Sequence, residues 1–256
     1  MTDLAEIVRA GDPDRHAASL AAPEGARAKL WPLYAFNLEI ARAPYVTQEP
    51  LIAQMRLQFW ADVLDDIDTG APARAHEVAA PLSALWRAEG LPVALGQAMI
   101  AARHWDIARD PFADDAALVA HLDATAGNLM WLAARVLGAR DDAEPVVRDM
   151  AFASGLANWL AAVPALQAAG RVPLVDDSDA AIRALAQQGL ARLTRARTQR
   201  GRVPKPATPA VLTGWQAGAV LRNAGRNPAL VRAGGLHRSE FVRRGGLLLR
   251  ALSGRW

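Results

Sequence analysis

The chain has 256 residues and no cysteine, which excludes disulfide bonds, thiolate metal sites and cysteine nucleophiles. Hydrophobic residues make up 52% of the chain but aromatic residues only 6%, a balance that suits helices better than strands. The net charge of +3 is unevenly distributed, with 14 Lys+Arg against 25 Asp+Glu in residues 1–182 and 15 against one in residues 183–256. This basic final third indicates either an anionic partner (lipid headgroups, nucleic acid or an acidic protein) or a solvated arginine-rich surface. We expect no nucleic acid partner.

The order of residues along the chain predicts an all-α protein. No segment of useful length alternates between apolar and polar residues, and no Asn-Gly or Asp-Gly pair marks a hairpin. Glycine and proline breaks separate the expected helices, which are residues 3–10, 14–21, 24–42, 48–68, 74–88, 91–108, 114–137, 142–168, 178–200, 209–223 and 238–253.

We expect one domain over residues 1–256. The proline-rich stretch from Gly201 to Pro209 has only nine residues, so it is interpreted as a loop within a bundle rather than as a linker. About residues 207–256 then form a basic helical segment. Thr47 and Thr208 are the expected N-caps of the helices that follow them, each with a proline close behind.

The stretch QFWADVLDDID (Gln58 to Asp68) contains four aspartates, of which Asp62 and Asp66 lie one helical turn apart on the same face. Two carboxylates at this spacing can hold Mg²⁺, but they can also form the wet face of an amphipathic helix. We expect the solvent-exposed face of an amphipathic helix. A metal site would need an opposing helix rich in carboxylates, and the best candidate segment offers only Asp123. The apolar face is predicted from residues at i+4 steps, namely Met55, Phe59, Val63 and Ile67.

Residues 150–170 carry no charge over 21 positions, a length that could span a bilayer. The run contains Asn158 and Pro164, however, and its apolar content is largely alanine. We therefore expect a buried core helix rather than a membrane span.

The last residues, EFVRRGGLLLRALSGRW (Glu240 to Trp256), alternate arginines with leucines in an amphipathic pattern. Such a helix could lie on an anionic membrane surface, or it could pack as the last helix of the bundle. The glycine pair Gly245-Gly246 would weaken a free surface helix, which favours packing. Residues 1–16 lack the apolar stretch of a secretory signal, so we expect a cytoplasmic protein, peripheral at the inner membrane if the first interpretation holds.

Three segments of the chain stand out when they are taken together in order and spacing. They are LYAFNLEIARAPYV (33–46), ATAGNLMWLAARVLG (124–138) and GLANWLAAVPALQAAGRVPLV (155–175). Together they resemble the squalene/phytoene synthase family. The resemblance covers roughly residues 15–200 and implies an isoprenoid synthase fold, which is a helical bundle with a central cavity. In that family two facing aspartate boxes hold Mg²⁺ ions that bind a diphosphate and assist its departure.

The chain departs from the family pattern at the metal ligands. The resemblance therefore implies no catalytic residue, no metal and no cofactor, with Mg²⁺ required only if the chain is an active prenyltransferase after all. The five histidines have no metal-binding spacing that would replace the lost carboxylates. The positions that correspond to the five family carboxylates hold Ala41, Arg42, Tyr45, Ala162 and Leu166.

Four residues on matching segments are predicted to bind an anion or another ligand. The two arginines in this set could equally pair with buried carboxylates such as Glu39 or Asp62. The four are Tyr34, Arg56, Asn158 and Arg171.

The segment FNLEIARAPYVTQEPLIAQMRLQFWADVLDDI (36–67) resembles more specifically a divergent branch of the family that acts in the biogenesis of respiratory complex I without catalysis. The resemblance implies a pseudoenzyme that serves as an assembly or scaffold factor, with a subunit of a respiratory complex as its partner. Two alternatives stay open. One is an active transferase of the phytoene or squalene synthase type, and the other is a carrier that holds an apolar ligand or lipid in the cavity.

Overall fold

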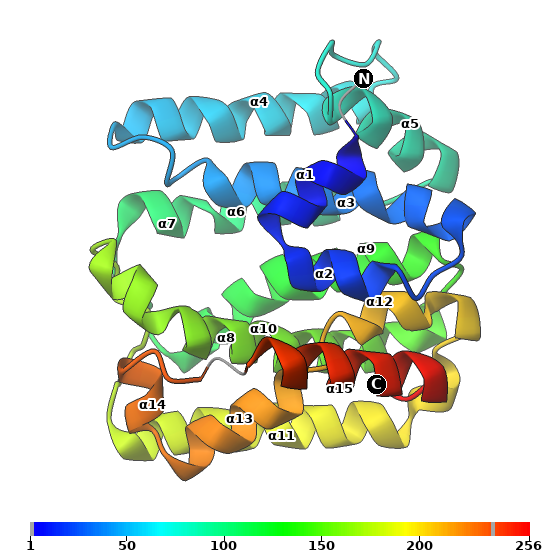
Figure 1. The fold of residues 1–256 in the computed structure, drawn as a ribbon. Coiled ribbons are helices and arrows are strands. Elements are labelled where there is room, and N and C mark those ends of the chain that lie inside the picture. The colour runs from blue at the N-terminus through cyan, green and yellow to red at the C-terminus, as the bar shows by residue number, and fades with distance from the viewer. Residues whose placement is uncertain (1–2, 237–238) are drawn as a thin grey trace.

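The structure, a computed structural model, describes residues 3–236 and 239–256, and within these ranges it is helical without strands. The all-α prediction is confirmed (Figure 1). The α-helices are α1 (Leu4–Gly11), α2 (Pro13–Ser19), α3 (Glu24–Arg42), α4 (Pro50–Asp68), α5 (Ala79–Glu89), α6 (Val93–Ala102), α7 (His104–Ala108), α8 (Asp115–Leu122), α9 (Asn128–Val136), α10 (Glu144–Ala168), α11 (Asp179–Thr198), α12 (Thr208–Leu212), α13 (Ala217–Arg226), α14 (Ala229–Arg232) and α15 (Glu240–Ser253).

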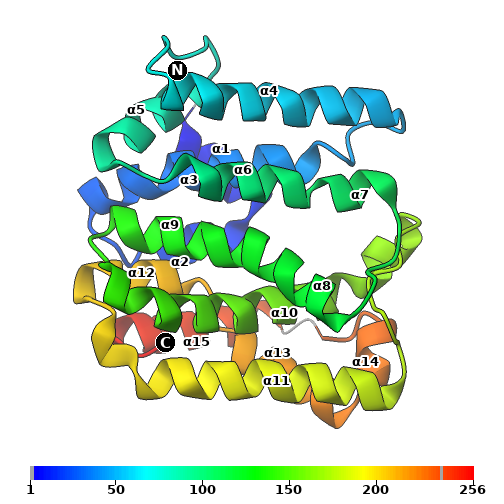
Figure 2. The same cartoon turned by 180° about the vertical axis from the view of Figure 1, so that it is seen from behind.

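The helices lie in layers, with α4 at one edge of the bundle and α11 at the opposite edge, as the views from the front and from behind both show (Figures 1 and 2). The long helix α10 lies between them and packs against α9, α11 and α13. Its residues from Met150 to Ala157 are all buried, which explains why the sequence has no charge there. The expected buried core helix is thus observed, and within the described ranges no helix is both long and apolar enough to cross a membrane.

A π-helical turn, η1 (Asp123–Gly127), interrupts the helix that the sequence predicts over residues 114–137. The Thr125 hydroxyl donates to the His121 carbonyl oxygen at 2.7 Å within this turn. On the facing helix, a Cβ at Gly155 would lie 2.7 Å from the Ala126 Cβ, so α10 and η1 approach closely only because residue 155 is glycine. π-Turns of this kind are often found beside functional sites.

Several helix boundaries differ from the predicted ones. The expected helix 91–108 is two helices, because the chain turns at Arg103 between α6 and α7. The expected helix 74–88 begins only at Ala79, and Arg74 lies in the preceding loop, where it binds Asp66 of α4. Thr47 is not an N-cap: its hydroxyl accepts from the Glu49 N–H in a local turn, and α4 starts after Glu49.

The helix predicted over 209–223 is likewise divided, into α12 and α13, and α12 begins at Thr208 rather than after it. The Ser178 hydroxyl caps α11 by accepting from the Ala181 N–H at 3.2 Å. The expected helices 24–42 and 142–168 agree with α3 and α10 within two residues at each end.

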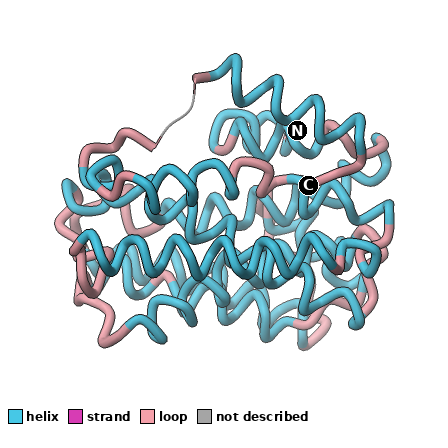
Figure 3. The backbone as a smooth tube through the Cα atoms, turned by 90° about the horizontal axis from the view of Figure 1, so that it is seen from below, coloured by secondary structure: helices cyan, strands magenta, loops and turns pink. Residues whose placement is uncertain are grey.

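The C-terminal helix α15 docks on the bundle by one face only. Arg243 forms an ion pair with Asp14 of α2, and the Arg243 carbonyl oxygen accepts from the Trp215 indole at 3.3 Å. The opposite face leaves Phe241 87% and Leu252 78% exposed, with Leu248 and Leu249 also exposed. In Figure 3 this helix runs along the upper edge of the molecule. The helix is therefore packed, as the glycine pair suggested, and also presents an apolar face to solvent.

Candidate functional site

A cavity of about 250 Å³ lies between α10 and the helices that face it. One face of α10 supplies its floor, since residues three or four apart on a helix point to the same side. The α10 residues are Gly155, Asn158, Trp159, Ala162 and Leu166. The facing residues come from α2, α3, the α3–α4 loop and the segment from Arg103 to Leu129, and include Arg15, Asn37, Tyr45, Asp106 and His121.

This cavity gathers three of the five positions predicted to correspond to family carboxylates, Tyr45, Ala162 and Leu166. The other two do not line it. Ala41 is half-buried on α3, and the exposed Arg42 directs its guanidinium toward Gly11 of α1. The predicted ligand-binding residue Asn158 lies in the cavity and also lines two neighbouring hollows of about 240 and 390 Å³ between α2, α10 and α13.

A hydrogen-bonded cluster closes one end of the cavity. The Tyr45 hydroxyl donates to Asp106 Oδ1 at 2.6 Å, and the Arg171 guanidinium lies 4.6 Å from the centre of the Tyr45 ring. Burial and the Asp106 carboxylate raise the pKa of the Tyr45 hydroxyl, so it stays a hydrogen-bond donor at physiological pH. The cluster ties the α3–α4 loop to α7 and to the loop after α10.

Arg171 is a structural residue in this cluster rather than a free anion site. It is buried, and its Nε and Nη2 donate to the Asp106 carbonyl oxygen at 3.1 and 2.6 Å. Its Nη1 donates to the Ala169 carbonyl oxygen. The turn that brings it there uses Gly170 at φ 75°, a conformation that favours glycine. The predicted pairing of Arg171 with Glu39 or Asp62 is therefore wrong, because its partner is a backbone oxygen.

Residues 8–178, which are 171 of the 256, match the squalene/phytoene synthase family profile. The chain belongs to the squalene/phytoene synthase family. Among solved structures, its fold matches a squalene synthase HpnC from Alicyclobacillus acidocaldarius with a TM-score of 0.74 at 16% identity, covering 91% of this chain and 93% of that one. A dehydrosqualene synthase in complex with ligand gives a TM-score of 0.71 at 16% identity, covering 98% and 94%. The predicted isoprenoid synthase fold is thus confirmed.

Curated relatives of this family member are named NADH dehydrogenase (ubiquinone) complex I, assembly factor 6. The Bos taurus protein is 28% identical over 160 residues and the Homo sapiens protein 26% over 163. The Mus musculus protein is 27% identical over 163 residues. Each match covers 62% of this chain and 48% of the relative, so the chain spans about half the length of the curated relatives it matches.

The cavity of this family member does not suit a Mg²⁺–diphosphate cluster. Mg²⁺ needs several hard oxygen ligands in near-octahedral geometry. The cavity offers one carboxylate, Asp106, and that group already accepts from Tyr45 and lies 3.7 Å from Arg103 Nη1. In the part of the chain that the structure describes, no group of three or more His, Asp or Glu side chains is placed to hold a metal ion.

Four mutually packed rings that the sequence did not single out include two cavity-lining residues, His121 and Trp159. Trp105 and Phe112 stack with centroids 4.7 Å apart and an interplanar angle of 3°, and Trp159 lies 5.1 Å from His121. Burial, with a contribution from Arg103, lowers the pKa of His121 to about 3. The imidazole is therefore neutral at physiological pH and acts as a fourth ring of the cluster.

Tyr34 and Arg56, the two remaining predicted ligand-binding residues, lie outside the cavity. Tyr34 is 2% exposed in the core, where Arg15 stacks over its ring at 5.3 Å and burial raises the pKa of its hydroxyl. Arg56 is exposed on α4. Sequence similarity alone suggested that Tyr34 and Arg56 bind a ligand. The residues around them in space do not join the two into one site.

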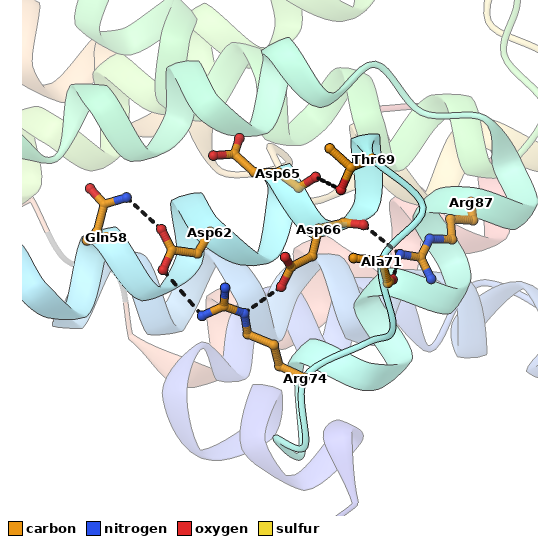
Figure 4. A network of polar contacts seen from close by, with 8 residues as sticks. All are labelled: Gln58, Asp62, Asp65, Asp66, Thr69, Ala71, Arg74 and Arg87. Carbon is orange, nitrogen blue, oxygen red and sulfur yellow. Dashed lines mark hydrogen bonds and ion pairs between the residues drawn. The ribbon is translucent and has the colours of Figure 1, made fainter.

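The acidic stretch of α4 is bound to the loop that follows it (Figure 4). Arg74 Nε donates to Asp66 Oδ2 at 2.5 Å and its Nη1 lies 3.3 Å from Asp62 Oδ2. Asp65 accepts from Gln97 Nε2 at 2.9 Å. These partly exposed carboxylates are paired with an arginine and an amide, and they face away from the cavity.

The predicted apolar face of α4 is correct at Val63 and Ile67, which are buried, and Phe59 is half-buried. It is wrong at Met55, which is 64% exposed. The i+4 steps drift around the helix, because 3.6 residues make one turn, so Met55 at the start of the series faces solvent.

Proposed function

We propose that this protein is a non-catalytic assembly or scaffold factor for respiratory complex I. The observation that carries the proposal is the cavity, where Tyr45, Ala162 and Leu166 stand at positions that correspond by sequence similarity to metal-binding carboxylates. A tyrosine, a methyl group and an isobutyl group cannot neutralise the charge of a departing diphosphate. The names of the curated relatives support the choice of complex I.

The rival function, prenyl transfer of the squalene or phytoene synthase type, is tested directly. The purified chain is incubated with Mg²⁺ and farnesyl or geranylgeranyl diphosphate, and released diphosphate is measured beside an active squalene synthase as positive control. We expect no release above the buffer blank. Turnover would overturn the pseudoenzyme proposal.

The assembly role is tested by capture. The immobilised full-length chain is expected to retain a subunit or assembly intermediate of respiratory complex I from solubilised membranes, identified by mass spectrometry and by blue-native gels. Retention of no complex I component under conditions in which the chain is folded would count against the assembly role.

We also propose that α15 places the protein peripherally on an anionic membrane surface. Its free face carries Phe241, Leu248, Leu249 and Leu252, and the last 74 residues hold 15 basic residues against one acidic residue. A helix with such a face inserts its apolar side at the headgroup boundary and keeps its arginines near lipid phosphates.

Vesicle flotation tests the membrane proposal. The full-length chain is expected to float with vesicles containing phosphatidylserine and to stay behind with phosphatidylcholine vesicles. The double variant Leu248→Glu/Leu249→Glu is expected to lose flotation. The matched control, Leu51→Glu/Met55→Glu, changes two equally exposed residues on α4 and should float like wild type. Equal flotation of both double variants would exclude α15 as the contact.

A second candidate function, carriage of an apolar ligand, is favoured by one observation about the cavity. Its walls combine aliphatic and aromatic side chains with polar ones, and Asp106 Oδ2 and Arg103 Nε are buried without a hydrogen-bond partner among the described residues. One acceptor beside one donor suits a neutral head group such as a hydroxyl. Lipid extraction and mass spectrometry of the purified chain test this. The variant Ala162→Leu, which fills the cavity, should lose any ligand that wild type retains.

A further inference from the structure

The outward face of α4 carries a stripe of residues that do not pack into the core. The helix buries the opposite side, including Leu57, Trp60 and Leu64, against the neighbouring layer. α4 also forms the outermost layer of the bundle in both Figures 1 and 2. Residues spaced by four, three, four and three positions return to the same side of a helix. The stripe so defined consists of Leu51, Met55, Gln58, Asp62 and Asp65.

The first half of the stripe is apolar. Leu51 is 67% exposed and Met55 64%, and Ile52 beside them is 45% exposed. Burying a side chain of this kind is worth about 1.5–3 kcal/mol relative to leaving it in water, so this surface gains free energy when it is covered. Methionine is flexible and adapts its shape to the surface it meets, which suits recognition.

The second half of the stripe is acidic. Residues 58–78, which include the end of α4 and the following loop, hold five carboxylates and one basic residue, Arg74. Asp62 and Asp65 are held in place by Gln58 and Gln97, which donate to them at 2.7 and 2.9 Å, and Asp62 Oδ2 also lies 3.3 Å from Arg74 Nη1. Over the helix from Leu51 to Asp65, about 21 Å long, the surface therefore changes from apolar to negative.

We propose that the α4 stripe docks an amphipathic helix of a partner protein, apolar in its first two turns and rich in lysine or arginine in its later turns. The apolar turns would cover Leu51 and Met55, while the basic turns would lie beside the carboxylates of Asp62 and Asp65. Two helices packed side by side bury such facing ridges at 8–10 Å between their axes. An anionic membrane does not fit the same surface, because the five carboxylates of residues 58–78 would repel it.

This inference rests on the proposed scaffold function, since it names the kind of partner that such a factor would hold. It differs from the membrane proposal in using a separate face, because α4 and α15 lie in different layers of the bundle (Figure 1). The stripe also lies outside the cavity and involves no metal or cofactor.

A synthetic helical peptide tests the inference without any component of complex I. The probe is a fluorescein-labelled 18-residue amphipathic peptide with leucines on one face of its first two turns and arginines in its last two. Binding to the full-length chain is measured by fluorescence anisotropy. The expected result is saturable binding that Leu51→Glu/Met55→Glu weakens at least about tenfold, a loss of about 1.4 kcal/mol.

Two controls distinguish binding at the α4 stripe from nonspecific binding of the peptide. The variant Leu248→Glu/Leu249→Glu on α15 should bind the peptide like wild type, and a peptide with glutamates in place of its arginines should bind at least about tenfold more weakly. Circular dichroism confirms that the variants fold, which is expected because the altered residues are exposed.

The inference is overturned if the α4 double variant binds the peptide as wild type does, or if the α15 variant loses binding equally. It is also overturned if light scattering shows a dimer of this chain that Leu51→Glu/Met55→Glu dissociates, because the stripe would then belong to a second copy. Failure of the complex I capture with normal peptide binding would refute only the proposed complex, not the docking surface.

Discussion

Replacing His121 by phenylalanine should make the protein more resistant to acid. In the wild-type fold the pKa of His121 is lowered to about 3, whereas in an unfolded chain it returns to about 6.5. Below pH 6.5 the unfolded state therefore binds a proton that the folded state excludes, and the free energy of unfolding falls by about 1.4 kcal/mol per pH unit. At pH 4.5, which is two units below the pKa in the unfolded chain, His121 lowers the free energy of unfolding by about 2.7 kcal/mol relative to pH 8.

Urea denaturation of wild type and His121→Phe at pH 8 and at pH 4.5 measures this effect. Other groups also titrate, so the informative quantity is the difference between the two proteins, which should shift by about 2–3 kcal/mol in favour of the variant on acidification. Phe112→Leu, in the same ring cluster, is the matched control and should lower the free energy of unfolding equally at both pH values. A difference between wild type and His121→Phe that does not change with pH would refute a neutral, buried imidazole.

Three further outcomes follow from individual contacts. Tyr45→Phe removes the donor to Asp106 Oδ1 and should lower the free energy of unfolding by about 1–2 kcal/mol, measured in urea; no loss would mean that the hydrogen bond is dispensable. Gly96→Ala would place a Cβ 2.8 Å from a Leu64 methyl and should destabilise by about 1 kcal/mol, whereas Gly25→Ala, with open space around it, should be neutral or slightly stabilising. Arg74→Gln should speed hydrogen exchange of amides 70–78 while leaving the urea midpoint nearly unchanged; a large midpoint shift would contradict this.

The fold was largely predictable from the sequence because most of its helices have strong local signals. The helices at 24–42 and 142–168 end just before a proline or a glycine, and both continue through an internal proline, Pro32 and Pro164. The break at Arg103 has no such signal, since no glycine or proline lies near it. What divides α6 from α7 is tertiary packing, which seats Asp106 under Tyr45 and Arg171.

The site was less predictable for the same reason. Of the five positions that family similarity aligned with metal-binding carboxylates, Tyr45, Ala162 and Leu166 lie around one cavity, whereas Ala41 and Arg42 do not. Family similarity did not identify Asp106 or the ring cluster around His121. These contacts join residues that are far apart in the chain, so they produce no periodic pattern in the sequence. Exposure on α4 was misjudged at Met55, where an i+4 series had drifted to the outer surface.

The uneven charge along the chain is also an uneven charge in space. The acidic helix α4 lies at one edge of the bundle, and the basic segment from α11 to α15 occupies the opposite half (Figure 1). The molecule therefore has an electric dipole, and a negatively charged surface turns it before contact so that the arginine-rich half arrives first. Because salt screens such fields over about 8 Å at physiological ionic strength, this orientation acts on the last approach and sets the rate of productive encounters. α4 then faces away from that surface and toward the solvent, where it is accessible to other proteins.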